Sequence, residues 1–310
     1  MVASVVSVAR AVGGALMMNA TSAGAQGRVE QAHRASEPEG RLLAYYSATM
    51  VLSPLGTVAH GRRWAAGVEG SWIPSLSESQ RRPGIDKPET TNLAPILPRP
   101  RVAVRTALAT LEASWVPPVT VGDAKANLWG FAASRTVATW HGVRLAPRLS
   151  LVAGRIEGSI TCNARTMAAR GRDLAVYYEK VCHGNDSNDW FEPRLVAGEL
   201  IGIRELLAGR GEAWLLAGGR IDRSRFDIGV RKDDGTRDTD HPILRLEDSR
   251  PHLGVGMRVA VASWMSVASE AFYAPGSVAT LRAFVALTGG RDARDARDAR
   301  DARDAAGARR

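Results

Sequence analysis

The sequence predicts an all-β protein, a transmembrane antiparallel up-and-down β-barrel of about ten strands. Many segments alternate apolar and polar residues with a period of two, as a strand with unlike faces does. The connections between these segments alternate between long and short, as in barrels whose turns and loops lie on opposite sides of a membrane. No segment has the run of about twenty apolar residues that a spanning helix needs.

Two segments precede the predicted barrel. Residues 1–25 have the features of a secretory signal peptide: a positive charge at Arg10, an apolar stretch over 11–18 and small residues at 23–25. The alternative is an apolar N-terminal helix of a cytosolic protein. Residues 26–63 are predicted to be a periplasmic or lumen-entering segment with a short helix near 42–50, and an additional strand over 45–51 is the alternative.

Residues 64–288 form the predicted barrel domain. Its expected strands are 64–76, 99–107, 110–117, 126–140, 143–157, 192–204, 211–222, 249–260, 262–274 and 277–288. The long connections follow the first, third, fifth and seventh strands, which places them at one end of the barrel. The last connection at that end is short, so eight and twelve strands remain as alternatives to ten.

A short motif recurs in strands that run toward the long-loop end. Glu112 precedes Trp115 by three residues, and the same spacing joins Glu69 to Trp72 and Glu270 to Tyr273, while Glu157 begins a shortened copy. Residues three apart in a strand point to opposite faces. The motif therefore predicts acids in a polar lumen and an outer aromatic girdle of Trp72, Trp115 and Tyr273.

Arginines on the intervening strands are expected to face the same lumen. The full set of predicted lumen charges is Glu69, Glu112, Glu157, Asp222, Glu270, Arg101, Arg105, Arg135, Arg204, Arg258 and Arg282. Acids and guanidinium groups on neighbouring strands can pair. Two interpretations follow: the paired charges fill a small barrel that conducts nothing, or they line a constricted pore that selects solutes.

The charge distribution argues against a nucleic-acid partner. The net charge is +9, but arginine is spread along the chain and is not gathered into one basic block. Residues 289–310 form a low-complexity tail in which Arg-Asp-Ala repeats. An outer-membrane barrel typically ends at an aromatic residue in its last strand, and this tail departs from that pattern.

The predicted outer loops contain the remaining candidates for chemistry. Cys162 and Cys182 are the only cysteines, share one loop and are predicted to form a disulfide in an oxidising compartment. A metal site with His183 would lack a clear fourth ligand, so neither a metal nor a cofactor is expected. Asp240 and His241 are the weak catalytic candidates, because a carboxylate beside a histidine can activate water.

Residues 64–287 resemble bacterial outer-membrane β-barrel proteins as an architectural class. The resemblance implies a bacterial outer-membrane location, contact with outer-membrane lipid, insertion by the barrel-assembly machinery, and passage of small solutes through a porin-like pore or a structural role. Asp240 and His241 also resemble, in residue type, the rim residues of omptin-type proteases, although no facing acid pair is found. The alternatives to a passive barrel are a surface hydrolase, a recognition or adhesion barrel, and a soluble periplasmic β protein.

Overall fold

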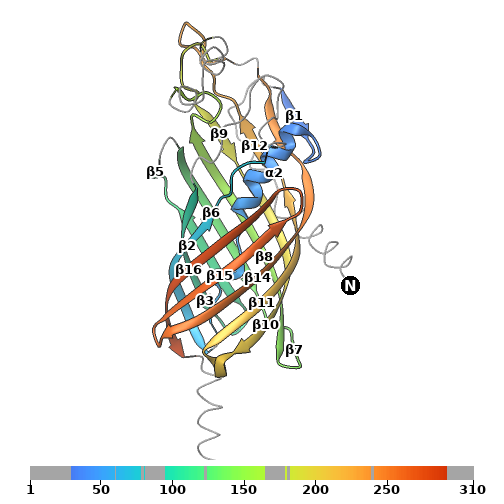
Figure 1. Ribbon diagram of the computed structural model, residues 1–310, viewed down its shortest axis with the longest axis vertical. Helices are drawn as coiled ribbons and strands as arrows, with labels where there is room; N and C mark the ends of the chain where they lie inside the picture. Colours follow the sequence, from blue (N-terminus) through green and yellow to red (C-terminus); the bar gives the residue numbers. More distant parts are fainter. Residues whose placement is uncertain are drawn as a thin grey trace, which may run out of the picture.

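Ten antiparallel strands close into a barrel, because the last strand pairs with the first along Arg282↔Ser71 to Arg291↔Arg62 (Figure 1). The computed structural model describes residues 29–59, 61–77, 80, 95–121, 124–164, 179, 182–238 and 241–291. The expected signal peptide, and the tail beyond residue 291, lie outside these ranges. The barrel strands are β2 (Arg62–Trp72), β3 (Ile96–Arg105), β4 (Thr110–Val116), β6 (Ala124–Ser134), β8 (Val143–Gly158), β10 (Arg194–Leu206), β11 (Gly211–Asp222), β14 (Asp248–Ala262), β15 (Met265–Ala274) and β16 (Val278–Arg291).

The strands follow the alternation of the sequence. In β3, Leu97, Arg99 and Arg101 are buried, while the residues between them are exposed. Outward positions along the wall carry exposed apolar side chains such as Val102 and Leu281. A closed wall with an apolar exterior and a polar interior is the architecture of bacterial outer-membrane barrels. The predicted fold class, including about ten strands, is confirmed.

The long connections gather at one end of the barrel and build a cap. Short strands β9 (Asp189–Glu192), β12 (Arg225–Asp227), β13 (Ile243–Leu246) and β1 (Glu30–His33) pair in that order, starting from the end of β8. β5 (Thr120–Val121) pairs with β6 at the same end, whereas β7 (Ala138–Trp140) forms a short turn with β8 at the opposite end. We call these the long-loop end and the short-turn end (Figure 1).

The N-terminal segment lies inside this wall. β1 belongs to the cap, and helix α2 (Pro38–Met50) occupies the mouth of the barrel (Figure 1). A 3₁₀ turn, η1 (Pro54–Gly56), lies deeper in the lumen. A second 3₁₀ turn, η2 (Leu207–Gly209), joins β10 to β11. None of the helices within the described ranges is both long enough and apolar enough to cross a membrane.

Candidate functional site

The lumen is filled by residues 50–58, which we call the plug segment. They connect helix α2 to β2, and all of them except Thr57 are buried. The segment is extended apart from η1, so its carbonyl groups have few partners within the segment itself. A buried carbonyl without a partner is costly, so the barrel wall must supply the missing donors.

Arginines of the wall supply these donors along the length of the plug segment. The first three bonds are Arg99 Nη2 to the Met50 carbonyl at 3.0 Å, Arg282 Nη1 to the Val51 carbonyl at 3.0 Å and Arg148 Nη1 to the Leu52 carbonyl at 2.8 Å. The next three are Arg101 Nη2 to the Ser53 carbonyl at 2.6 Å, Arg258 Nη2 to the Leu55 carbonyl at 2.7 Å and Arg105 Nη2 to the Val58 carbonyl at 3.0 Å. Four wall strands, β3, β8, β14 and β16, thus hold one backbone segment with six bonds.

The same arginines pair with acids of the wall. Arg101 bonds both Glu69 and Glu112, the second at 2.6 Å. Arg148 continues the chain of ion pairs from Glu112, at 3.0 Å, to Glu199, at 2.5 Å. Side chains of these residues are at most 1% exposed, and buried charges of this kind persist only when they are paired and hydrogen-bonded.

Five further contacts, around Glu199, Glu270 and Glu212, extend this charge network. His252 Nε2 lies 3.0 Å from Glu199 Oε1. Trp214 donates its indole N–H to Glu270 at 3.0 Å, and Arg282 lies 3.8 Å from the same carboxylate. Nearer the short-turn end, Glu212 binds Arg258 at 3.1 Å and Arg144 at 2.5 Å. The network therefore runs around the lumen on both sides of the plug segment.

Glycine makes the close contact between plug and wall possible at two positions. A Cβ on Gly56 of the plug segment would lie 2.4 Å from Nε of Arg101. A Cβ on Gly130 of β6 would lie 2.4 Å from the Ser114 hydroxyl and 3.5 Å from the Leu52 side chain. A side chain at Gly56 would displace Arg101, which holds the plug segment, and one at Gly130 would displace Ser114 of the wall, beside Leu52 of the plug segment.

Most of the lumen charges expected from the sequence do line the lumen. The eight that do are Glu69, Glu112, Asp222, Glu270, Arg101, Arg105, Arg258 and Arg282. Trp72, Trp115 and Tyr273 are exposed near the long-loop ends of their strands, where an aromatic girdle would lie. The ring of Trp115 also stacks on Trp129 of β6, with 5.2 Å between centroids.

The other three predicted lumen charges lie on the outer face of the wall or at the mouth of the lumen. Glu157 is half exposed because its neighbour Ile156 turns into the core, which forces Glu157 to the outer face. Arg204 is exposed for the same reason, since Ile201 faces inward. Arg135 lies just past the end of β6, where it is exposed and lines the cavity that opens at the short-turn end. Glu157 and Arg204 thus do not line the lumen, whereas Arg135 lies at its short-turn mouth.

The sequence reasoning missed several lumen residues, namely Arg99, Arg144, Arg148, Glu199, Glu212, Arg220 and His252. Arg148 and Glu199 lie in the stretches A-P-R-L-S-L-V and V-A-G-E-L-I-G, where apolar residues on both sides hide the alternation. Their signal was the isolated charge within an apolar run, because an unpaired charge facing lipid would be costly.

The loop candidates are in the cap. Cys162 and Cys182 form the predicted disulfide, which confirms that pairing, so their sulfurs are not metal ligands. His241 Nε2 lies 3.3 Å from Asp238 in an exposed loop, and Asp240 is outside the described residues. The pairing of Asp240 with His241 in catalysis therefore stays a prediction.

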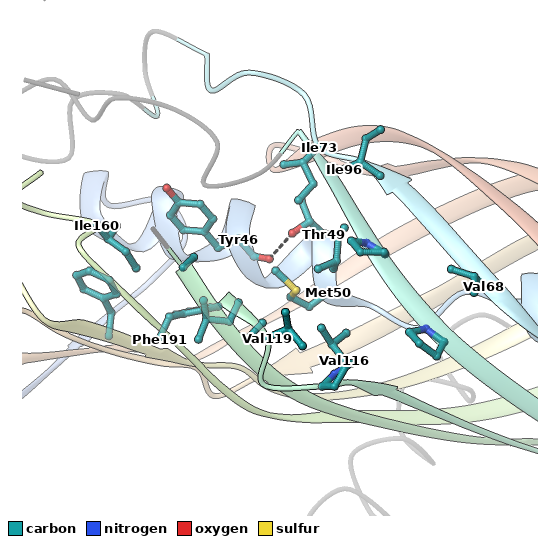
Figure 2. A pocket seen from close by; sticks show the side chains of 18 residues that line it. Tyr46, Thr49, Met50, Val68, Ile73, Ile96, Val116, Val119, Ile160 and Phe191 are labelled. Atoms are coloured by element: carbon teal, nitrogen blue, oxygen red, sulfur yellow. Dashed lines mark hydrogen bonds between the residues drawn. The ribbon is translucent and has the colours of Figure 1, made fainter. Parts of the chain in front are cut away.

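Two cavities flank the plug segment. One, of about 520 Å³, opens at the short-turn end and is lined by polar and charged side chains that include Arg105, Arg144 and Glu212. The other, of about 310 Å³, lies toward the long-loop end, and its lining is almost entirely apolar (Figure 2). Tyr45, beside it on α2, donates its hydroxyl to the Pro74 carbonyl, and burial raises the pKa of Tyr45 to about 12.

Comparisons with known proteins identify no subfamily. No protein-family model matches the chain, and no curated protein matches its sequence. Among solved structures, the toluene transporter TodX of Pseudomonas putida is similar over 74% of this chain and 68% of its own, with 9% identity and a TM-score of 0.29. The toluene transporter TbuX of Ralstonia pickettii is similar over 86% and 76%, with 11% identity and a TM-score of 0.27. The translocator domain of the autotransporter NalP from Neisseria meningitidis is similar over 81% and 93%, with 11% identity and a TM-score of 0.32. These scores transfer no function, and the fold assignment rests on the strand pairing.

Proposed function

We propose that the protein is a bacterial outer-membrane barrel for the passive transport of small solutes, and that its own N-terminal plug segment closes the lumen. The observation that carries the proposal is the set of wall arginines that donate to plug carbonyls. The wall holds the plug by hydrogen bonds between polar groups, so water could replace every one of these partners if the segment moved.

The composition of the lumen favours transport over a purely structural role. Buried ion pairs contribute little to stability compared with apolar residues of similar size, so a barrel that is merely filled has no need of them. A wall lined by arginine and glutamate would instead hydrate once the plug left. The polar cavity at the short-turn end already reaches Glu212 and Arg258, next to the plug segment.

The test is conductance in planar lipid bilayers. We compare the wild type with a variant that lacks residues 29–58, and use heat-dependent gel mobility to show that both are folded barrels. The wild type is expected to be closed for most of the recording, and the deletion variant to conduct steadily. The variant should prefer anions, because the arginines of the wall outnumber its acids: Arg99, Arg101, Arg105, Arg144, Arg148, Arg220, Arg258 and Arg282 against Glu69, Glu112, Glu199, Glu212, Asp222 and Glu270.

A point variant tests the same idea with the segment in place. Gly56→Ala should raise the open probability, because its Cβ would press on Arg101. Gly70→Ala on β2 is the matched control, since its Cβ would meet only the Ile96 side chain, at 3.7 Å. A folded deletion variant that conducts no better than the wild type would exclude transport and leave the structural role.

A further inference from the structure

The apolar cavity at the long-loop end lies between the plug and the barrel wall. Tyr46, Thr49 and Met50 of α2 form its inner side, and Val116 of β4 faces them (Figure 2). Leu97 of β3 also belongs to its lining. An apolar cavity offers water few hydrogen-bond partners, so it stays dry or takes an apolar ligand.

The barrel wall is incomplete beside this cavity. β3 pairs with β2 as far as Trp72↔Ile96, and β4 pairs with β6 as far as Val116↔Leu128. The ladder between β3 and β4, however, ends at Arg101↔Ser114. The upper parts of both strands are described by the structure, yet they are not joined there. We call this gap the β3–β4 seam.

Proline accounts for the seam on the β3 side. Pro98 and Pro100 have no N–H to donate, and Pro117 follows the last residue of β4. An unpaired N–H within a bilayer is costly, so proline is the residue that leaves a strand edge open at the least cost. The opening is therefore encoded in the sequence.

The cavity is continuous with the lipid-facing exterior through this seam. Its lining includes Val68, Ile96 and Val119, which are 51%, 57% and 60% exposed, as well as the buried Leu97 and Val116. In Figure 2, Ile96 lies on one side of the cavity, Val116 and Val119 lie on the other, and Met50 lies between them.

The level of the seam indicates which lipids it meets. Ile96 pairs with Trp72, and Trp115 is next to Val116, so the seam lies at the outer aromatic girdle. Aromatic residues of such a girdle mark the boundary between hydrocarbon and headgroups. An opening at this height faces the hydrocarbon chains of the outer leaflet.

We propose that this cavity binds the hydrocarbon chain of an outer-leaflet lipid, which enters sideways through the β3–β4 seam. The proposal goes beyond solute transport and needs no movement of the plug segment. It requires only that the barrel lie in a membrane. The bound chain would contact Met50 and Leu97, both of which face away from bulk lipid.

The test is photo-crosslinking in phosphatidylcholine vesicles that contain a small fraction of the same lipid with a diazirine at the end of one acyl chain. After irradiation, adducts are mapped by mass spectrometry on protein that still shows heat-dependent mobility. We expect adducts at Met50 and Leu97 in addition to those at lipid-facing positions such as Val104. Labelling of Val104 with no labelling of Met50 or Leu97 would overturn the proposal.

Three variants test separately whether the lipid chain occupies the cavity and whether it enters through the β3–β4 seam. Val116→Trp should fill the cavity and abolish the Met50 adduct, whereas Val104→Trp on the outer face of β3 should leave it intact. Replacing Pro98 and Pro100 with Val restores two N–H donors and should reduce the Met50 adduct without filling the cavity. If a water-borne diazirine fatty acid labels Met50 and the lipid does not, entry is from the aqueous side and the lateral route is wrong.

Discussion

At the residue scale, Arg148 contacts both the acids of the wall and the plug segment, although in the sequence it lies within a largely apolar stretch. It contacts Glu112, Glu199 and two carbonyls of the plug segment. Arg148→Met should cost about 3–5 kcal/mol of unfolding free energy, because removing one partner leaves buried charges uncompensated. The measurement is the urea midpoint of the heat-dependent mobility shift.

Arg155 provides the matched control for Arg148. Its side chain is 44% exposed and lies 2.6 Å from Glu192 on the outer surface. Exposed ion pairs are worth about 1 kcal/mol or less, so Arg155→Met should barely move the midpoint. If Arg148→Met and Arg155→Met lower the urea midpoint equally little, water hydrates the carboxylates around Arg148 and the lumen is not sealed.

The sequence predicts the lumen charges well where alternation is regular and poorly where it is not. Glu69, Glu112 and Glu270 could be assigned to the lumen because each lies in a strand with clear two-residue periodicity. Arg204 could not be assigned correctly, because its strand is apolar on both sides of Glu199. The pattern alone therefore does not decide which face of that strand points into the lumen. The bonds from arginine to plug carbonyls were beyond prediction, because every residue carries a carbonyl and the sequence does not distinguish those that lack a partner.

At the element scale, the disulfide belongs to the cap and not to the wall. Cys162 and Cys182 are buried against Val230, and no barrel strand contains either of them. The bond closes a loop with a sequence separation of 20, for which the chain-entropy model gives about 3 kcal/mol. Reduction should therefore expose this loop to added protease while the heat-dependent mobility shift of the barrel persists.

The Cys162→Ser, Cys182→Ser double variant should behave like the reduced protein without any reductant. Limited proteolysis of protein in vesicles, followed by mapping of the first cleavage sites, gives the readout. Loss of the mobility shift on reduction would show instead that the cap holds the barrel closed.

The barrel strands, and a short helix near 42–50 in a periplasmic or lumen-entering segment, could be predicted, but the cap strands could not be. Long strands can be recognised from their two-residue alternation and from the lengths of their connections. β9, β12 and β13 have only three or four residues each, which is too few to show such alternation. Residues 42–50 left helix and strand open because Leu42, Leu43, Tyr46 and Met50 fit one helical face while 45–51 is rich in strand formers. The helix α2 forms because this segment is buried in the mouth of the barrel, an environment that exists only once the wall has closed.

At the scale of the whole molecule, the described part of the chain begins in the cap at residue 29 and ends at the short-turn end at residue 291. β1 pairs in parallel with β13 in the cap, and Glu30 fastens it by ion pairs to Arg225 at 3.0 Å and Arg245 at 3.2 Å. From there the chain descends through α2 and the plug segment to the start of β2 at the short-turn end, where β16 also finishes. The N-terminal part thus spans the lumen from the cap downward.

This path predicts which end of the chain is displayed outside the cell. An epitope inserted between Gln26 and Val29 should bind antibody on intact cells, as should one in the loop between Asp234 and Gly235. An epitope at the C-terminus should bind only after the outer membrane is permeabilised, because β16 ends at the short-turn end. If the loop epitope is exposed but the one before Val29 is not, the segment reaches the lumen from the periplasmic side and the pairing of β1 with β13 does not exist in the membrane. Exposure of both would support the path seen in the structure, in which residues 29–58 run from the cap down through the lumen to β2.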